Sequence, residues 1–167
     1  MSTNKASFPW LALCVGIVIL FLDVITKYLT QSNLSPLIYS YSYPYGGIGI
    51  FENLGGIEFS IVHHTNKGAA WGMGAEYQFP LLLLRVVLIL GLLIYVIFFN
   101  KNPSYRIPLA MITAGALGNV LDFFIYGHVI DMFQFVFWGY HYPVFNVADS
   151  AIFLGIAALL MLSFKNK

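Results

Sequence analysis

Four long apolar stretches dominate the pattern of hydrophobic and polar positions along this chain. They cover approximately residues 8–29, 79–99, 107–126 and 147–164. Each is close to the ~20 residues that a helix needs to cross a hydrocarbon core ~30 Å thick. The pattern therefore predicts four transmembrane helices in an all-α membrane protein. Only Lys5 precedes the first stretch as a basic residue, and no small-x-small cleavage site follows it, so we expect a retained helix rather than a signal peptide.

The long segment between the first two stretches has a different period. Large side chains alternate with smaller or polar ones at residues 39–45 and 57–62, where they are Tyr39, Tyr41, Tyr43, Tyr45, Ile57, Phe59 and Ile61. A period of two is typical of strands. Gly46-Gly47 and Gly55-Gly56 are suited to turns. We therefore expect a small β-sheet within about residues 34–78.

The composition indicates a membrane protein of one domain, covering residues 1–167. Hydrophobic residues make up 59% of the chain, charged residues only 9%, and the mean hydropathy is +0.79. Soluble domains average about 25% charged residues. The single cysteine, Cys14, cannot form an internal disulfide. The formal net charge of +1 leaves no basic stripe to meet phosphates, which argues against a nucleic-acid partner.

Basic residues indicate the orientation of the helices. If the chain crosses the membrane four times, five of them flank the helix ends on one side: Lys5, Lys101, Arg106, Lys165 and Lys167. The other side has only Lys67 in its loops and Lys27 at a helix end. By the positive-inside rule, both termini are expected in the cytoplasm and the long loop with its sheet outside it. The tight turn at residues 100–103 makes the second and third helices antiparallel neighbours.

All four aspartates lie within or at the end of an apolar stretch: Asp23, Asp122, Asp131 and Asp149. An ionisable side chain at or near a bilayer must find a partner or water, so each is a functional candidate. The predicted topology brings all four to the outer leaflet boundary, together with Asn119 and Arg85. Asp23 is four residues from Lys27 on one helix face, where the two can pair. Asn146 stands in a capping position before the fourth helix.

Asp131 and Asp149 flank the loop between the third and fourth predicted helices. An aspartic protease needs at least two adjoining carboxylates. One activates water, and its protonated partner hydrogen-bonds and protonates the scissile amide. Two close carboxylates do not both ionise easily, so the proton belongs to the pair. A run of small residues around one amide, residues 66–72, would let a ligand approach the backbone closely. These features predict an aspartyl hydrolase at the membrane surface.

Five segments spread over nearly the whole chain carry a resemblance to a known family: Asp23-Val-Ile-Thr-Lys27, Asn66-Lys-Gly-Ala-Ala-Trp71-Gly, Gly115-Ala-Leu-Gly-Asn119-Val-Leu-Asp122, Gly127-His-Val-Ile-Asp131 and Phe145-Asn-Val-Ala-Asp149-Ser. In order and spacing they resemble the bacterial lipoprotein signal peptidase, signal peptidase II. The resemblance implies a membrane-embedded aspartyl endopeptidase without metal or organic cofactor. Its substrates would be diacylglyceryl-modified prolipoproteins, cleaved just before the lipidated cysteine.

Carried onto matching positions, the resemblance makes Asp131 and Asp149 the catalytic pair. It implies substrate-binding or supporting roles for a further set of residues: Asp23, Lys27, Asn66, Gly68, Ala69, Asn119, Asp122, Asn146 and Ala148. It implies the bacterial cytoplasmic (inner) membrane as the location, with the active site at the outer leaflet. The expected partners are lipidated prolipoproteins, membrane lipids and the cyclic peptide inhibitor globomycin. We expect the chain to act as a monomer.

The chain departs from the family's usual pattern at three places. Phe123 stands where the family usually has an arginine directly after the Asp122 position. This chain therefore has no arginine there to make the substrate contact that the family's arginine usually makes. Arg85 on the second helix is our candidate to supply the missing charge. Met132 replaces the usual phenylalanine after the first catalytic aspartate. Residues 37–51 are extra sequence that would extend the wall of the substrate groove.

Simpler interpretations of these residues stay open. Asp23 and Lys27 would form a structural ion pair, and Asn146 a plain helix cap. For the whole chain, an ion-conducting carrier is an alternative, because intramembrane acids also mark ion pathways, although the internal repeat that carriers tend to show is missing. A non-enzymatic membrane subunit, held together by polar residues between its helices, is another.

Histidines suggest a metal site at first sight: His63, His64, His128 and His141. The chain has no His-Glu-x-x-His motif, however, and neighbouring residues of a strand point to opposite faces. His63 and His64 would therefore not share a ligand. We predict no metal site.

Overall fold

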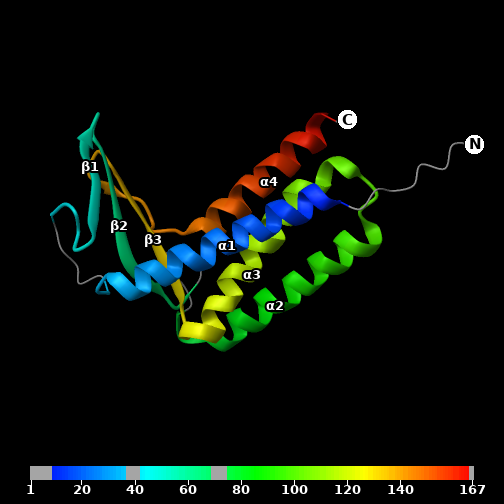
Figure 1. The fold of residues 1–167 in the computed structure, drawn as a ribbon, viewed down its shortest axis with the longest axis horizontal. Coiled ribbons are helices and arrows are strands. Elements are labelled where there is room, and N and C mark those ends of the chain that lie inside the picture. Colours follow the sequence, from blue (N-terminus) through cyan, green and yellow to red (C-terminus); the bar gives the residue numbers. More distant parts are fainter. Residues whose placement is uncertain (1–8, 37–41, 69–74, 166–167) are drawn as a thin grey trace, which may run out of the picture.

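The computed structural model describes residues 9–36, 42–68 and 75–165. Helix α3 lies among three other long helices, and a β-sheet stands across one end of this bundle (Figure 1). The long helices are α1 (Trp10–Asn33), α2 (Gln78–Ile94), α3 (Arg106–Tyr126) and α4 (Val147–Lys165). A π-helical turn, η3 (Tyr95–Phe99), extends α2, and the short 3-10 helices η2 (Ala75–Tyr77) and η4 (Pro103–Tyr105) precede α2 and α3. The four predicted helices are confirmed to within a few residues.

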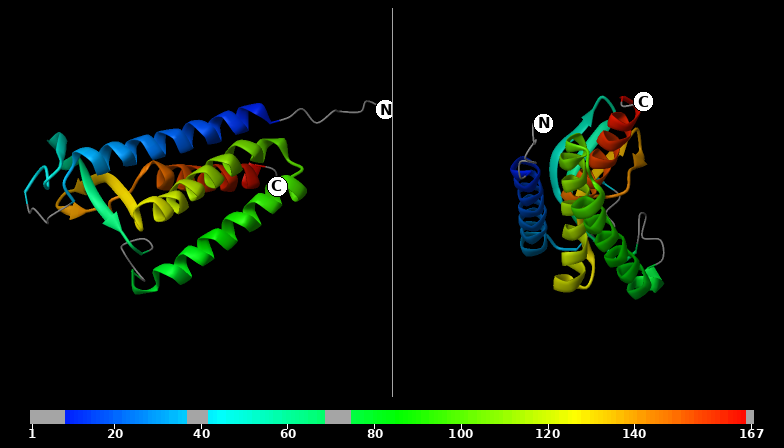
Figure 2. Two further views of the ribbon diagram at one scale, coloured as in Figure 1. Left: turned by 60° about the horizontal axis from the view of Figure 1, so that its bottom comes forward. Right: turned by 90° about the vertical axis from the view of Figure 1, so that its right-hand side faces the viewer.

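All four helices are long and apolar enough to cross a membrane. Their outward side chains are large and hydrophobic, and those of Phe79, Phe153 and Met161 are each more than 70% exposed. A soluble monomer rarely exposes apolar surface on this scale, whereas lipid tails cover it. This is a multi-pass membrane protein. The beginning of α1 and the end of α4 lie at the same end of the bundle, opposite the sheet (Figures 1 and 2).

Small residues let α3 approach its neighbours closely. Gly115 lies against the backbone of Ala148 on α4, and Gly118 lies against the carboxylate of Asp23 on α1. A methyl group at either glycine would overlap that neighbour. Gly155 on α4 in turn lies against the backbone of α3. Because lipid tails are as apolar as leucine, helices in a bilayer associate through close packing and polar contacts of this kind.

A left-handed glycine ends α3 and directs the chain into the sheet. Gly127 has a φ of +77°, and its N–H donates to the carbonyl oxygen of Phe123 at 3.0 Å. Glycine adopts this conformation without the steric penalty of a side chain, so it commonly follows the last helical residue. Strand β3 (Val129–Phe137) begins two residues later. Asp131 therefore lies on a strand rather than in a loose loop.

The sheet has four antiparallel strands in the order β1-β2-β3-β4. As predicted, β1 (Ile48–Leu54) and β2 (Ile57–Asn66) come from the long loop and are joined by a turn at Gly55-Gly56. Strands β3 and β4 (Tyr140–His141), however, connect α3 to α4, outside the predicted sheet region 34–78. Strand β3 is apolar at nearly every position and buried or half-buried on both faces, so it lacks the period of two that identifies β2.

The tyrosine run does not form the predicted strand where the structure describes it. Residues 42–47 make a turn, in which Tyr45 has a φ of +61°, and residues 37–41 lie outside the described part. The Tyr45 ring is buried in a small core with Val62, and its hydroxyl donates to the carboxylate of Glu58. Burial and this hydrogen bond raise the pKa of Tyr45 to about 12. Tertiary packing of one ring, rather than strand pairing, sets the conformation of this segment.

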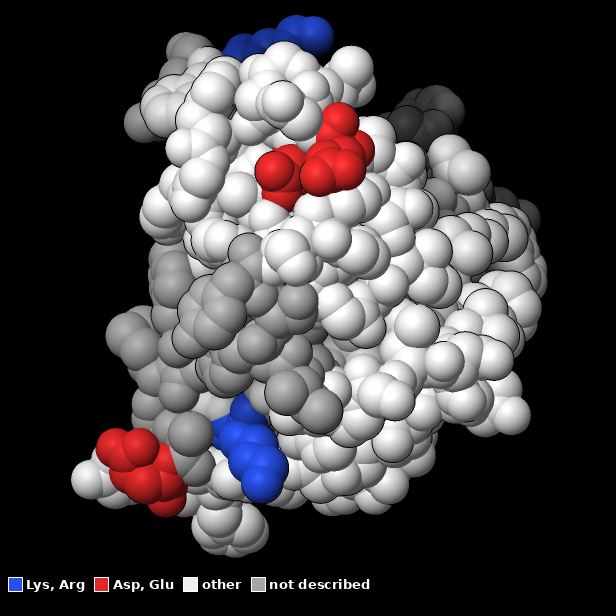
Figure 3. Space-filling model, turned by 90° about the vertical axis from the view of Figure 1, so that its left-hand side faces the viewer, with Lys and Arg blue, Asp and Glu red and all other residues white. Residues whose placement is uncertain are grey.

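The opposite face of the sheet carries connected aromatic rings: Phe51, Phe59, Phe133, Phe135, Phe137, Tyr142 and Phe145. Phe59 and Phe135 stack with centroids 4.4 Å apart. Asp131 is two residues from Phe133 on β3 and so shares this face. Charged side chains occupy only small parts of this end of the molecule (Figure 3). The carboxylate of Asp131 thus lies at the end of an apolar surface.

Candidate active site

A fully buried lysine joins α1 to α3 at the sheet end of the bundle. Nζ of Lys27 donates to Oδ2 of Asp23 at 2.7 Å and to Oδ1 of Asn119 at 3.0 Å, and it lies 2.8 Å from Oδ2 of Asp122. The side chains of Lys27 and Asp23 have no exposed surface. An ammonium group has three hydrogens, and three acceptors surround this one. The predicted pair of Asp23 and Lys27 is present, with Asp122 as a second carboxylate.

The two carboxylates also hold the backbone of neighbouring elements. Oδ1 of Asp23 accepts a hydrogen bond from the N–H of Ala148 in the first turn of α4, at 2.8 Å. Oδ2 of Asp122 accepts one from the N–H of Ile130 on β3, at 3.2 Å. Each of these N–H groups belongs to the residue directly before a predicted catalytic aspartate. The buried ion cluster therefore positions both segments that carry the aspartates.

Asn146 is the cap of α4 and also connects the two aspartates. Its Oδ1 accepts from the N–H of Asp149 at 2.8 Å, and Oδ2 of Asp149 accepts from the N–H of Asn146 at 3.3 Å. This reciprocal arrangement satisfies N–H groups that a helix start leaves unpaired. The Nδ2 of Asn146 donates to Oδ1 of Asp131 at 2.7 Å and to Oδ1 of Asn119 at 3.1 Å. The predicted cap is confirmed, and it also contacts both aspartates.

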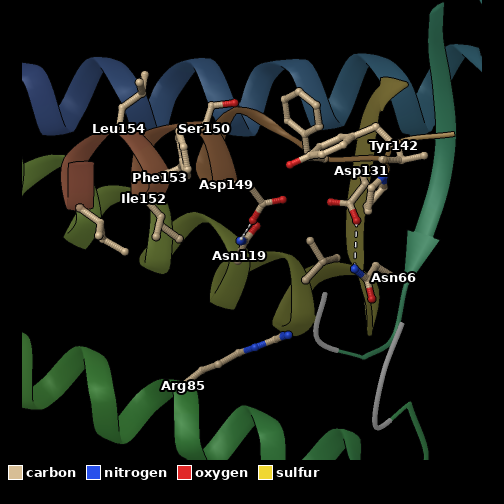
Figure 4. A pocket seen from close by; sticks show the side chains of 15 residues that line it. Asn66, Arg85, Asn119, Asp131, Tyr142, Asp149, Ser150, Ile152, Phe153 and Leu154 are labelled. Carbon is tan, nitrogen blue, oxygen red and sulfur yellow. Dashed lines mark hydrogen bonds between the residues drawn. The ribbon is translucent and has the colours of Figure 1, made fainter. Parts of the chain in front are cut away.

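Both predicted catalytic aspartates accept hydrogen bonds from asparagine amides. Oδ2 of Asp131 accepts from Nδ2 of Asn66 at 3.1 Å, in addition to the bond from Asn146. Oδ1 of Asp149 accepts from Nδ2 of Asn119 at 2.8 Å. In Figure 4 the two carboxylate side chains point toward one another. Asp131 lies on strand β3 and Asp149 on helix α4, and the fold brings these two acids to one place.

A pocket of about 690 Å³ adjoins the two aspartates. Its polar end is formed by the aspartates with Asn66 and Asn119, and Ile152, Phe153, Leu154 and Ile156 of α4 line its apolar wall. Arg85 extends into it from α2 (Figure 4). The volume is in the range of small-molecule and peptide sites, roughly 300–1,000 Å³. Because Phe153 and Leu154 are also exposed on the apolar outside of the helix, the pocket borders the lipid-facing surface.

Comparison with known proteins identifies the family. The family model described as signal peptidase (SPase) II matches residues 15–165. The chain belongs to the signal peptidase II family. The lipoprotein signal peptidase of Chlamydia caviae is 31% identical over 158 residues, which cover 92% of this chain and 89% of that protein. The lipoprotein signal peptidase of Chlamydia pneumoniae is 42% identical over 108 residues, and this match spans 64% of each protein, less than two thirds of the relative's length.

The fold also agrees with solved structures. A bacterial membrane enzyme determined by the in meso method at 1.9 Å resolution superimposes with a TM-score of 0.77, covering 99% of this chain and all of that chain at 24% identity. A second such structure, at 2.3 Å resolution, gives a TM-score of 0.76 over 93% of this chain. The likeness establishes the arrangement of four helices and a small sheet for this member of the signal peptidase II family.

Arg85 is our candidate for the charge that the signal peptidase II family usually places after the Asp122 position. The cation beside Asp122 is Lys27, so Asp122 does not lack a positive partner. Arg85 instead donates to the carbonyl oxygen of Gly68 at 2.7 Å, while the N–H of Gly68 donates to Oδ1 of Asn66 at 3.0 Å. Ala69 lies outside the described residues. Its role and that of Arg85 towards substrate stay predictions.

The histidines do not gather around a metal site. Among the described residues, no group of three or more histidine, cysteine, aspartate or glutamate side chains is placed to hold a metal ion. His63 is buried, with Nδ1 2.9 Å from the carbonyl oxygen of Leu34, whereas His64 lies beside Asp131. The sequence of this signal peptidase II chain does not indicate that His64 lies beside Asp131, because only the pairing of β2 with β3 brings these two residues together.

Proposed function

We propose that this protein is an aspartic endopeptidase that removes signal peptides from diacylglyceryl-modified prolipoproteins. Asp131 and Asp149 are the catalytic pair, and cleavage occurs before the lipidated cysteine. One observation carries the proposal: the two carboxylates point toward one another at the end of a single pocket, and Asn146 bonds to both. Membership of the signal peptidase II family supports the substrate class.

The chemistry needs one ionised and one protonated carboxylate. The ionised carboxylate takes a proton from water as the water oxygen attacks the scissile carbonyl carbon, and the protonated carboxylate gives its proton to the carbonyl oxygen. The C–N bond of the resulting tetrahedral adduct then breaks, and a proton passes to the leaving nitrogen. The products are the carboxyl group of the signal peptide and the free amine of the lipidated cysteine. Asn119 and Asn66 hold the two carboxylates in this geometry.

A membrane-bound site suits a substrate that carries its own lipid. The pocket lies between α4 and Arg85 of α2 and borders the lipid-facing surface, so the diacylglyceryl chains can stay in the bilayer while the peptide enters from the side. Gly68 is held by Arg85 and Asn66, two residues that line the pocket. These contacts favour recognition of an extended peptide whose anchor stays in lipid.

The proposal includes a location. The enzyme is placed in the bacterial cytoplasmic membrane with both termini in the cytoplasm, because Lys101, Arg106 and Lys165 flank helix ends away from the sheet and Lys5 and Lys167 adjoin the same ends in sequence. The aspartates then lie at the outer leaflet, where lipidated prolipoproteins are anchored. Globomycin-type cyclic peptides would compete for the pocket. The chain acts as a monomer in contact with membrane lipids.

Purified protein with a diacylglyceryl-modified prolipoprotein tests the function directly. Wild type should release the signal peptide, and globomycin should block the release. Asp131→Asn and Asp149→Asn should each lower kcat by at least about 100-fold, the usual minimum contribution of a general acid or base. Glu52→Gln, which neutralises an exposed acid on β1, should leave kcat unchanged. Cleavage retained by either aspartate variant would exclude the pair, and inactive wild type would exclude the enzyme.

A further inference from the structure

A bulge in β2 decides which histidine faces Asp131. Ile61 pairs with Phe133, and His64 pairs with Asp131, so β2 advances three residues where β3 advances two. The extra residue leaves Val62 and His63 buried together. Without it, His63 would stand opposite Asp131. Bulges are common beside active sites, where they re-aim side chains.

The bulge gives Asp131 two neighbours from one strand. Asn66, two residues after His64, donates its amide to Oδ2 of Asp131 at 3.1 Å. Nδ1 of His64 lies 3.9 Å from the same oxygen. This Nδ1 is buried and has no hydrogen-bond partner among the described residues, while the ring as a whole is 35% exposed. A buried nitrogen without a partner is costly, and a movement of about 1 Å would give it a normal hydrogen-bond distance to Asp131.

We propose that His64 is a positioning residue of the catalytic pair, which donates from Nδ1 to Oδ2 of Asp131 and makes Asp131 the aspartate that carries the negative charge. This inference rests on the proposed function. Asp131 then has three donors, Asn146 on Oδ1 and Asn66 with His64 on Oδ2. Asp149 has two, the Asn119 amide on Oδ1 and the N–H of Asn146 on Oδ2 at 3.3 Å, so Asp149 keeps the shared proton. Asp131 is then the base that activates water, and Asp149 is the acid.

If Asp131 is the ionised carboxylate, the groups around it should affect how kcat depends on pH. Charged and titratable groups around His64 and its partner come from several elements: Asp131 of β3, Asp149 of α4, Arg85 of α2, Asp23 and Lys27 of α1, His63 on β2 itself and Lys67 directly after β2. Of these, Asp131 is the one whose carboxylate lies within 4 Å of the ring. A hydrogen-bond donor at Oδ2 of Asp131 stabilises the ionised form of a carboxylate over its protonated form.

The test measures kcat and KM across pH 5 to 8.5 with the lipidated prolipoprotein. His64→Gln should leave KM within about twofold, because the ring acts on the carboxylate rather than on bound substrate. It should lower kcat and move the acid limb of the kcat profile to higher pH by about one unit. His64→Lys, which restores a positive charge, should return the acid limb toward the wild-type position.

His63→Gln is the matched control, since it removes the adjacent histidine from the opposite face. It should lower the melting temperature without moving the pH profile. Melting temperatures of all variants establish that each is folded, and His64→Asn provides a second substitution if His64→Gln does not fold. A His64→Gln profile that superimposes on wild type, or a change in KM alone, would overturn the positioning role while active wild type upholds the proposed function. An inactive wild type would reject both.

Discussion

Lys27 and Asn119 are joined by a hydrogen bond of 3.0 Å that determines which way the Asn119 amide points. An ammonium group only donates, so the atom facing Lys27 must be the oxygen Oδ1. The Nδ2 group then faces the other way and donates to Asp149 at 2.8 Å. A buried cation thereby orients a donor onto Asp149, a carboxylate of the proposed catalytic pair, without touching it. The asparagine orientation, commonly ambiguous, is set by this network.

Asn119→Asp should impair catalysis more than folding. The new carboxylate keeps an oxygen for Lys27 but replaces the donor to Asp149 with an acceptor. Hydrogen bonds to charged groups contribute about 1.5–3 kcal/mol, so kcat should fall by roughly 10- to 100-fold. Cleavage kinetics and melting temperature measured together check this, with the exposed Asn33→Asp at the end of α1 as control. Unchanged kcat would mean that the amide donor is dispensable.

Lys27→Met should destabilise the fold strongly. It leaves Asp23 and Asp122 buried without their cation, and breaking a buried ion pair costs about 3–5 kcal/mol. Unfolding in mixed detergent micelles measures the change. Lys67→Met, on an exposed residue, should be neutral.

The triple variant Lys27→Met/Asp23→Asn/Asp122→Asn distinguishes the effect of unpaired buried charge from the effect of lost side-chain packing. It should recover part of the stability lost in Lys27→Met, because no unpaired charge remains buried. If the triple variant is less stable than Lys27→Met alone, packing of the lysine side chain rather than its charge holds the cluster.

Gly118→Ala should disturb the ion cluster through sterics alone. A methyl group there would overlap Oδ2 of Asp23, which pairs with Lys27. Overpacking of this kind typically costs about 1–3 kcal/mol. Gly91→Ala on α2 is the matched control, since nothing lies within 4 Å of its position, and the better helix propensity of alanine should stabilise by up to about 1 kcal/mol. Equal effects of the two substitutions would contradict the close contact.

Acid should weaken the fold through His128. Burial, followed by the nearby His63 and Lys67, lowers the pKa of His128 below its ordinary 6.5. The folded ring therefore stays neutral at a pH where the unfolded chain already binds a proton, so stability falls as pH drops below about 6.5. Melting temperatures from pH 7.5 to 5 should show this fall. His128→Gln should flatten it, and the exposed His141→Gln should not.

The four membrane helices were predictable from sequence, and the two aspartates proposed from it as the catalytic pair line one pocket. Helix length follows from bilayer thickness, and acids next to apolar stretches are rare enough to identify. The spacing of Asp23 and Lys27 also predicted their contact. Asp122 as the second partner of Lys27 was not predictable, because it lies on another helix and depends on how closely Gly118 lets α3 approach α1.

The sequence by itself determined which segments enter the membrane, since burial in lipid depends on the composition of each stretch alone. Only the tertiary structure decided that 129–137 is a strand, because a strand covered on both faces has no alternating pattern. It also decided that His64 rather than His63 stands beside Asp131. A bulge of one residue exchanges the two faces of β2, and bulges arise from the pairing of strands that are distant in the chain.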